Sequence, residues 1–139
     1  MKASIKSDYA CRAIEALALH YPNSKPMCIE EIARQWHIPS NYLVQILLEL
    51  KRHGLIQSRR GKMGGYLLAR PPHQISLGDV LRAVQGQVID LPGLSERQCP
   101  GEIKQAWQRV KTAAEEAANS VTFEQICAAA PHPSLMYDI

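Results

Sequence analysis

The stretch that decides the fold is IEEIARQWHIPSNYLVQILLELKRHGLI, residues 29–56. Apolar residues recur at helical spacing over 29–36 and again over 40–53, and His37-Ile38-Pro39 between them allows only a tight connection. Ser40 is placed to cap the second helix and Gly54 to end it. A short helix, a tight turn and a longer helix are typical of a helix-turn-helix, whose second helix enters a major groove.

The second helix has a side left free for binding. Its inward stripe is predicted to be Leu43, Ile46, Leu47 and Leu50. The residues predicted on the opposite, polar side are Asn41, Gln45, Glu49 and Arg52. By itself this pattern also fits any small three-helix bundle. The residues after the second helix are therefore needed to distinguish a helix-turn-helix from such a bundle.

The next stretch, SRRGKMGGYLLAR at residues 58–70, is a basic, glycine-rich loop. A phosphate-binding P-loop requires Ser or Thr after Gly-Lys and then a helix, whereas Gly61-Lys62 is followed by Met63 and a strand pattern. The dinucleotide-binding fingerprint fails as well, because the glycine spacing is wrong and no helix begins there. The loop is therefore not predicted to hold a nucleotide.

The same loop fits the wing of a winged helix. Residues 55–58 and 66–69 each read as a short strand, with the glycines in the connection between them. Arg59, Arg60 and Lys62 offer long cationic side chains to phosphates or to a narrow minor groove. The glycines permit a close approach to the DNA backbone.

Helical patterns complete the chain on both sides of this unit. A first helix is predicted over residues 7–21, capped by Ser7 or Asp8, and further helices over 76–84, 102–119 and 122–130. The fold class is therefore mainly α, a winged helix-turn-helix with a small hairpin. Its expected parts are a winged-helix domain at 1–84, a sensor-type loop at 85–101, and a dimerisation helix, short last helix and tail at 102–139.

The long helix carries an apolar seam with the period of helices that pair. The seam recurs in steps of four, three, four and three. Its members, predicted to form a dimer interface, are Ile103, Trp107, Val110, Ala114 and Ala117.

Charge is distributed unevenly along the 139 residues. Residues 1–70 carry a net charge of +6, and residues 71–139 carry −3, against +3 for the whole chain. The basic half is the natural contact for a polyanion such as DNA. No apolar run is long enough for a membrane span, and no signal-peptide core follows Met1, so we expect a cytoplasmic protein with no membrane partner.

No catalytic set stands out in the sequence. The five histidines are dispersed, and none pairs recognisably with a nucleophilic Ser or Cys. We therefore do not expect an enzyme. The remaining alternative to a DNA-binding regulator is a winged-helix module that docks a protein partner and no longer reads DNA.

Three stretches resemble one family of bacterial regulators. They are YACRAIEALAL at 9–19, residues 29–56 quoted above, and RGKMGGYLLARP at 60–71, within a similarity running from about 1 to 84. On these residues the chain is similar to the IscR/NsrR/CymR, or Rrf-type, winged-helix transcription regulators. The resemblance implies a homodimer, a repressor or other regulator, bound to a pseudo-palindromic operator with the helix over 40–53 in the major groove and the wing in the minor groove.

The resemblance also implies individual contacts. Ser40, Tyr42 and Gln45 match positions at the start of the DNA-reading helix, and Arg60 matches the wing arginine. Two alternatives to DNA contact remain. In one, Tyr42 belongs partly to the buried core, and in the other, Gln45 is only solvated. Val44 departs from the glutamate that the family often has there, and valine offers only apolar contact, for example with a thymine methyl. The predicted DNA contacts are Ser40, Asn41, Tyr42, Gln45, Arg52, Arg59, Arg60 and Lys62.

The second departure from the family concerns the residues that would sense a signal. Cluster-bearing relatives place three cysteines in the loop before the long helix, whereas residues 87–101 contain only Cys99. Asp8 matches a position where some members supply a carboxylate ligand from the other subunit, although it is equally a plain acid at a helix start. One alternative is a nonstandard iron–sulfur cluster on Cys99 and Asp8, with Cys11 or Cys28 as a further ligand. The others are a redox-reporting Cys99 thiol and a cluster-free regulator that answers to a partner protein or small ligand. We expect no cofactor.

Overall fold

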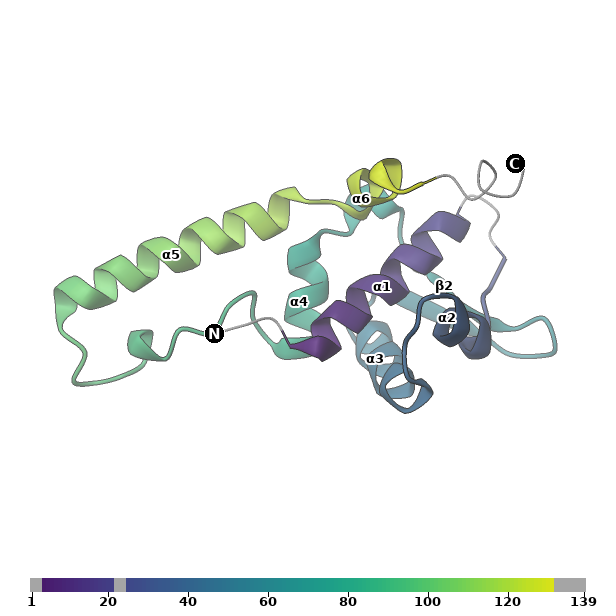
Figure 1. Ribbon diagram of the computed structural model, residues 1–139, viewed down its shortest axis with the longest axis horizontal. Coiled ribbons are helices and arrows are strands. Elements are labelled where there is room, and N and C mark those ends of the chain that lie inside the picture. Colours follow the sequence, from purple (N-terminus) through teal and green to yellow (C-terminus); the bar gives the residue numbers. More distant parts are fainter. Residues whose placement is uncertain (1–3, 22–24, 132–139) are drawn as a thin grey trace.

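The computed structural model describes residues 4–21 and 25–131 and is mainly helical (Figure 1). The C-terminal tail expected after the last helix lies, from residue 132 on, outside the described residues. The elements run in the order α1 (Ile5–His20), α2 (Ile29–Gln35), α3 (Ser40–Arg52), β1 (Ile56–Arg59), β2 (Gly65–Leu68), α4 (Leu77–Gln85), α5 (Gly101–Ser120) and α6 (Phe123–Ala129).

One hydrophobic core joins α1, α3, α4 and α6 with the base of the hairpin. The predicted inward stripe of α3 is confirmed, because Leu43, Ile46, Leu47 and Leu50 are all fully buried. Burying a Leu or Ile side chain favours folding by about 1.5–3 kcal/mol, so this stripe fixes which side of α3 faces solvent. Gly54 adopts φ 74° just after α3, which confirms it as the stop.

Two predicted helix caps are wrong. α1 is capped by Ser4, whose Oγ accepts from the Ser7 amide, and the helix begins at Ile5, two residues earlier than expected. Ser7 lies inside the helix, is buried, and donates from its Oγ to Gln85 at 2.7 Å. α3 begins at Ser40 as predicted, but its cap is Pro39, whose carbonyl oxygen accepts from the Tyr42 and Leu43 amides, and the Ser40 side chain makes no capping bond.

The hairpin is antiparallel, with Ile56 opposite Leu68 and Arg59 opposite Gly65. Each strand is displaced by one residue from its expected bounds, toward the turn. Outside the hairpin, Met27 exchanges two backbone hydrogen bonds with Tyr66, at 2.9 and 2.8 Å, which adds a bridge to the free edge of β2. The wing is therefore fastened to the segment before α2.

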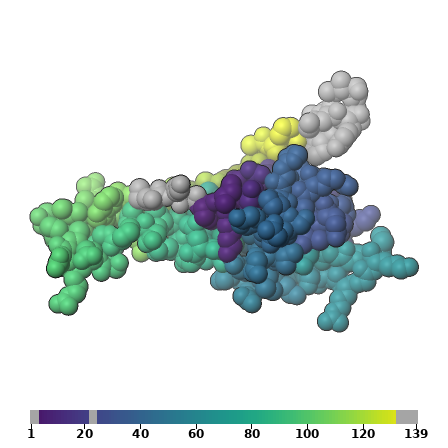
Figure 2. All heavy atoms as spheres, turned by 60° about the horizontal axis from the view of Figure 1, so that its bottom comes forward, coloured from purple at the N-terminus to yellow at the C-terminus, as the bar shows by residue number. Residues whose placement is uncertain are grey.

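α5 projects away from the rest of the molecule and gives it an elongated outline (Figures 1 and 2). Its C-terminal end is held by backbone pairing of residues 75–77 with 121–123, where Leu77 donates to Val121 at 2.8 Å and Phe123 to Ile75 at 3.0 Å. The loop before α5 contains a short 3-10 turn, Pro92–Leu94. Among the helices of residues 4–21 and 25–131, none combines the length and apolar character that crossing a membrane requires.

Candidate nucleic-acid interface

The outward side of α3 is a straight row of exposed side chains. Residues spaced by four, three and four share one face of a helix. We call this row the α3 ridge; it consists of Asn41, Gln45, Leu48 and Arg52, all exposed. The ridge is free to contact another molecule along more than two turns of helix.

One member of the row differs from the sequence prediction. Glu49, expected on the free side, is half-buried and forms an ion pair with Lys6 of α1, at 2.6 Å between Nζ and Oε1. Leu48 occupies the ridge instead and is 44% exposed. The helical period alone places both residues near the boundary, and the position of α1 decides between them.

Tyr42 lies where α3 meets α1. Its ring packs against Tyr9 with 5.7 Å between centroids and a 59° tilt, and 44% of the residue stays exposed. The Arg12 guanidinium lies over the other ring, 5.2 Å from the Tyr9 centroid. Tyr42 is therefore not a core residue, and its position is set by an aromatic contact that leaves it accessible. Ser40 is exposed at the start of the same helix.

The turn of the helix-turn-helix is held from α1. Arg12 donates from Nη1 to the carbonyl oxygens of Trp36 and His37, at 3.4 and 3.3 Å, and pairs with Asp8 at 2.7 Å. His37 has φ 55°, a left-handed conformation that costs energy for a residue with a side chain. The two hydrogen bonds offset part of that cost and help fix the direction in which α3 leaves the turn.

A concentration of positive charge lies beside the α3 ridge. The residues of this basic cluster, all exposed, are Lys51, Arg52, Arg59, Arg60 and Lys62. Within the described residues, none of the five forms an ion pair with a carboxylate. Lys51 donates to Ser58 Oγ at 2.8 Å, which links the end of α3 to β1. The wing itself stands out from the body of the molecule (Figure 2).

Glycine is required at the two positions that shape the wing. A Cβ atom on Gly64 would collide with the Arg59 carbonyl oxygen, and one on Gly65 with the carbonyl oxygen of Met27. Gly65 also has φ 151°. These close backbone contacts fix the path of the chain at the turn of the wing, next to Arg59, Arg60 and Lys62.

A second exposed surface runs along α5. Ile103, Trp107 and Val110 are 45%, 37% and 42% exposed, which is unusual for large apolar side chains in one row. In the rest of this α5 stripe, Ala114 is half-buried and Ala117 is exposed. A further apolar hollow between α1 and α4 is lined by Ile5, Cys11, Leu77 and Leu81.

The candidate sensor residues do not form a metal site. Cys99 is half-buried in the loop, close to Gly93 and the Trp107 indole, and Asp8 is engaged by Arg12. Burial raises the pKa of the Cys11 and Cys127 thiols to about 11, so both stay protonated at neutral pH. No group of three or more His, Cys, Asp or Glu able to hold a metal was found in residues 4–21 and 25–131. An iron–sulfur cluster needs about four such ligands, so this donor set does not fit one.

Cys127 of α6 is half-buried against the edge of the core. α6 lies across the outside of α1 and so covers the core with one face only (Figure 1).

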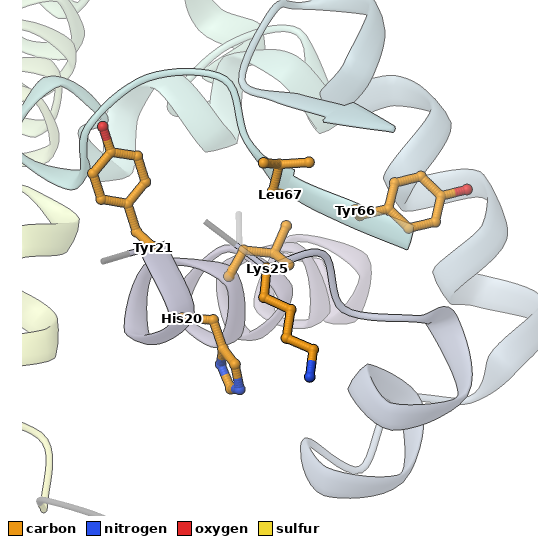
Figure 3. Close-up of a pocket in the computed structure, with 6 residues that line it drawn as sticks. His20, Tyr21, Lys25, Tyr66 and Leu67 are labelled. Atoms are coloured by element: carbon orange, nitrogen blue, oxygen red, sulfur yellow. The ribbon is translucent and has the colours of Figure 1, made fainter. Parts of the chain in front are cut away.

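The cavity shown in Figure 3 lies between the end of α1 and β2 and is lined in part by His20, Lys25, Tyr66 and Leu67. Its volume of about 30 Å³ suits a water molecule and is far too small for a metabolite. His20 is occupied locally, with Nδ1 3.1 Å from the Ala16 carbonyl oxygen. The cavity is a packing defect behind the wing and has no part in the interface.

Known proteins share both the sequence and this arrangement. Residues 3–129 match the Rrf2 family model, described as an iron-dependent transcriptional regulator. The chain is 30% identical to the HTH-type transcriptional regulator CymR of Bacillus subtilis over 126 residues, which cover 91% of this chain and 89% of CymR.

Solved structures agree with the sequence comparison. The structure of B. subtilis CymR, the global cysteine regulator, superposes with a TM-score of 0.82 at 26% identity, covering 94% of this chain and 99% of that one. The T. potens IscR structure gives a TM-score of 0.78 at 30% identity, covering 99% and 97%. These likenesses confirm the winged-helix fold and favour DNA binding over the protein-docking alternative. The chain therefore belongs to the Rrf2 family, and like its relatives it is a DNA-binding transcription regulator.

Proposed function

We propose that the protein binds a pseudo-palindromic operator as a homodimer, with the α3 ridge of each subunit in a major groove and the wing on the adjacent minor groove. The observation that carries the proposal is the exposed α3 ridge with the basic cluster directly beside it. A helix surface of this kind fits a major groove, and exposed cations next to it fit the flanking phosphates.

The side chains divide into two kinds of contact. Asn41 and Gln45 carry amides, which pair with the edge of adenine through two hydrogen bonds and so read sequence. Arg52, Arg59 and Lys62 neutralise phosphates and set the register of the protein on the duplex. Arg60 inserts into the minor groove, where a narrow width strengthens the attraction of a guanidinium. Ser40 and Tyr42 contact the backbone at the entrance to the major groove.

The α5 stripe pairs with the stripe of a second copy. The stripe leaves three large apolar side chains exposed in the single chain, on a helix that projects from the body. Water contact with apolar surface is unfavourable by about 25 cal/mol per Å², which a second copy would relieve. Two-fold pairing presents two α3 ridges to one face of DNA, and this matches a palindromic site.

Replacing Gln45 with alanine tests the proposal. We expect the variant to bind the operator about 1–3 kcal/mol more weakly and to lose preference for one base pair in each half-site, because the amide that reads it is gone. Selection from a random duplex library, followed by footprinting of wild type and variant, measures both effects. Footprints and selected sequences identical to wild type would contradict the placement of α3.

Lys62→Gln is the matched control for this experiment. Loss of the Lys62 charge should weaken binding to all sequences alike and reduce the slope of log affinity against log salt by about 0.9, since one phosphate contact is lost. If neither variant changes binding, and the wild type shows no preference among duplexes at low salt, the surface docks a protein and not DNA.

We propose further that the regulator works without an iron–sulfur cluster. One loop cysteine, an Asp8 held by Arg12 and the raised pKa of the Cys11, Cys28 and Cys127 thiols support this, and they leave Cys99 as the thiol available for oxidation or for a partner's signal. We expect protein purified without oxygen to be colourless, to contain no stoichiometric iron or sulfide, and still to bind its operator. A visible absorption band with matching iron and sulfide would contradict this.

A further inference from the structure

Two apolar side chains lie together on the outward side of α3, where polar recognition does not require them. Val44 is 55% exposed and Leu48 is 44% exposed. Four residues apart, they sit one above the other on the helix, and Lys51 continues the same row three residues further on. Leu48 also lies on the α3 ridge between Gln45 and Arg52. The pair therefore forms one small apolar surface bordered by polar and cationic groups.

The fold gives no reason for this pair. The core side of α3 is already filled by four side chains that are fully buried, so neither Val44 nor Leu48 is needed there. Valine is among the weaker helix formers, so helix stability does not favour it at an exposed position. A single exposed apolar residue needs no explanation, but two adjacent ones inside a DNA-facing surface imply a ligand with apolar groups.

DNA offers one apolar group to a protein in the major groove. Of the four bases, only thymine carries a methyl group on that edge, at C5, and aliphatic side chains contact it. Lys51 and Arg52, which follow the pair toward the end of α3, match phosphates that flank such a methyl. An apolar partner protein would meet the same charges without compensation.

We propose that Val44 and Leu48 read thymine methyl groups, so that each operator half-site has thymines at fixed positions beside the base pair contacted by Gln45. This assignment rests on the placement of α3 in the major groove proposed above. Gln45 then reads through hydrogen bonds, while Val44 and Leu48 read through apolar contact on the neighbouring base pairs. The specificity of the half-site comes from both kinds of contact.

Replacement of thymine by deoxyuridine tests the assignment, because it removes the methyl group and keeps every hydrogen bond. With the operator selected by the wild-type protein, each thymine under α3 is replaced singly. We expect the affinity to fall about four-fold for each methyl that the pair contacts. Deoxyuridine at thymines under the wing is the control and should have no effect, since the methyl lies in the major groove.

The variants Val44→Ala and Leu48→Ala locate the effect. Both residues are exposed, so their truncation should leave the fold intact. Each variant should bind the thymine and deoxyuridine duplexes equally at its own position and still distinguish them at the other.

The outcomes separate the two proposals. If the wild type selects an operator but tolerates deoxyuridine at every position, the methyl assignment is wrong and the groove placement stands. If both variants keep the full thymine preference, the methyls are read by other residues and the assignment is again wrong. If the protein selects no operator at all, the groove placement fails and the assignment with it.

Discussion

Replacement of Trp107 by aspartate is expected to convert the proposed dimer to a monomer and to lower the affinity for the full operator by at least about 100-fold. Trp107 lies between Ile103 and Val110 in the middle of the α5 stripe and is 37% exposed in the single chain. A carboxylate there would be buried without a partner when two stripes meet, which is strongly unfavourable. Two half-sites would then be bound independently, so the gain from linked binding is lost.

The measurement combines light scattering over a range of concentrations with titration of full-operator and half-operator duplexes. The monomer should bind a half-site as well as the wild-type subunit does, because its α3 ridge is untouched. Gln105→Asp is a matched control, since Gln105 is exposed on the other side of α5. A Trp107→Asp protein that remains dimeric would place the dimer interface elsewhere.

Replacement of Phe123 by alanine is expected to lower the free energy of unfolding by about 3–5 kcal/mol. Phe123 is fully buried, and it is the residue through which the start of α6 enters the core. Its amide also donates to the Ile75 carbonyl oxygen at 3.0 Å, where the segment before α4 pairs with the segment after α5. Truncation of the buried side chain would leave a cavity beside this pairing. Few single substitutions in a domain of this size have a larger effect.

Urea unfolding at one fixed protein concentration measures the loss, because a dimer unfolds in a concentration-dependent way. Glu124→Ala is the control at the next residue: its side chain is exposed, and we expect a change within about 0.5 kcal/mol. An unchanged urea midpoint for Phe123→Ala would mean that α6 does not contribute to the core of the protein in solution.

The sequence predicts every helix of the winged unit, because each one buries a strongly periodic stripe. The inward face of α3 is an example, since four apolar residues at helical spacing leave no other orientation. Failures occur where a distant segment decides. Glu49 is held against α1 because Lys6, far away in the chain, pairs with it, so it is not free on the ridge. Periodicity within α3 carries no information about Lys6.

The candidate site shows the same limit. The basic residues of the wing are evident from their order in the chain, but the pairing of Met27 with β2 from outside the hairpin has no signal in the hairpin's own sequence. The support given by Arg12 to the turn at His37 has no local signal either, because it joins α1 to a loop about two dozen residues later. The sequence therefore predicts the helices and strands themselves, but it does not predict the contacts between them.

The backbone pairing of residues 75–77 with 121–123 has a consequence for the DNA. Two hydrogen bonds join the end of α5 to the start of α4, and Arg82 in the last turn of α4 donates to Asn119 at 2.8 Å, so we expect the angle between α5 and the DNA-binding unit to be fixed. Each added base pair between half-sites turns them by roughly a tenth of a helical turn, which a rigid dimer of the proposed kind would not follow. We therefore expect the length of the spacer to restrict the choice of operator as strictly as the bases do.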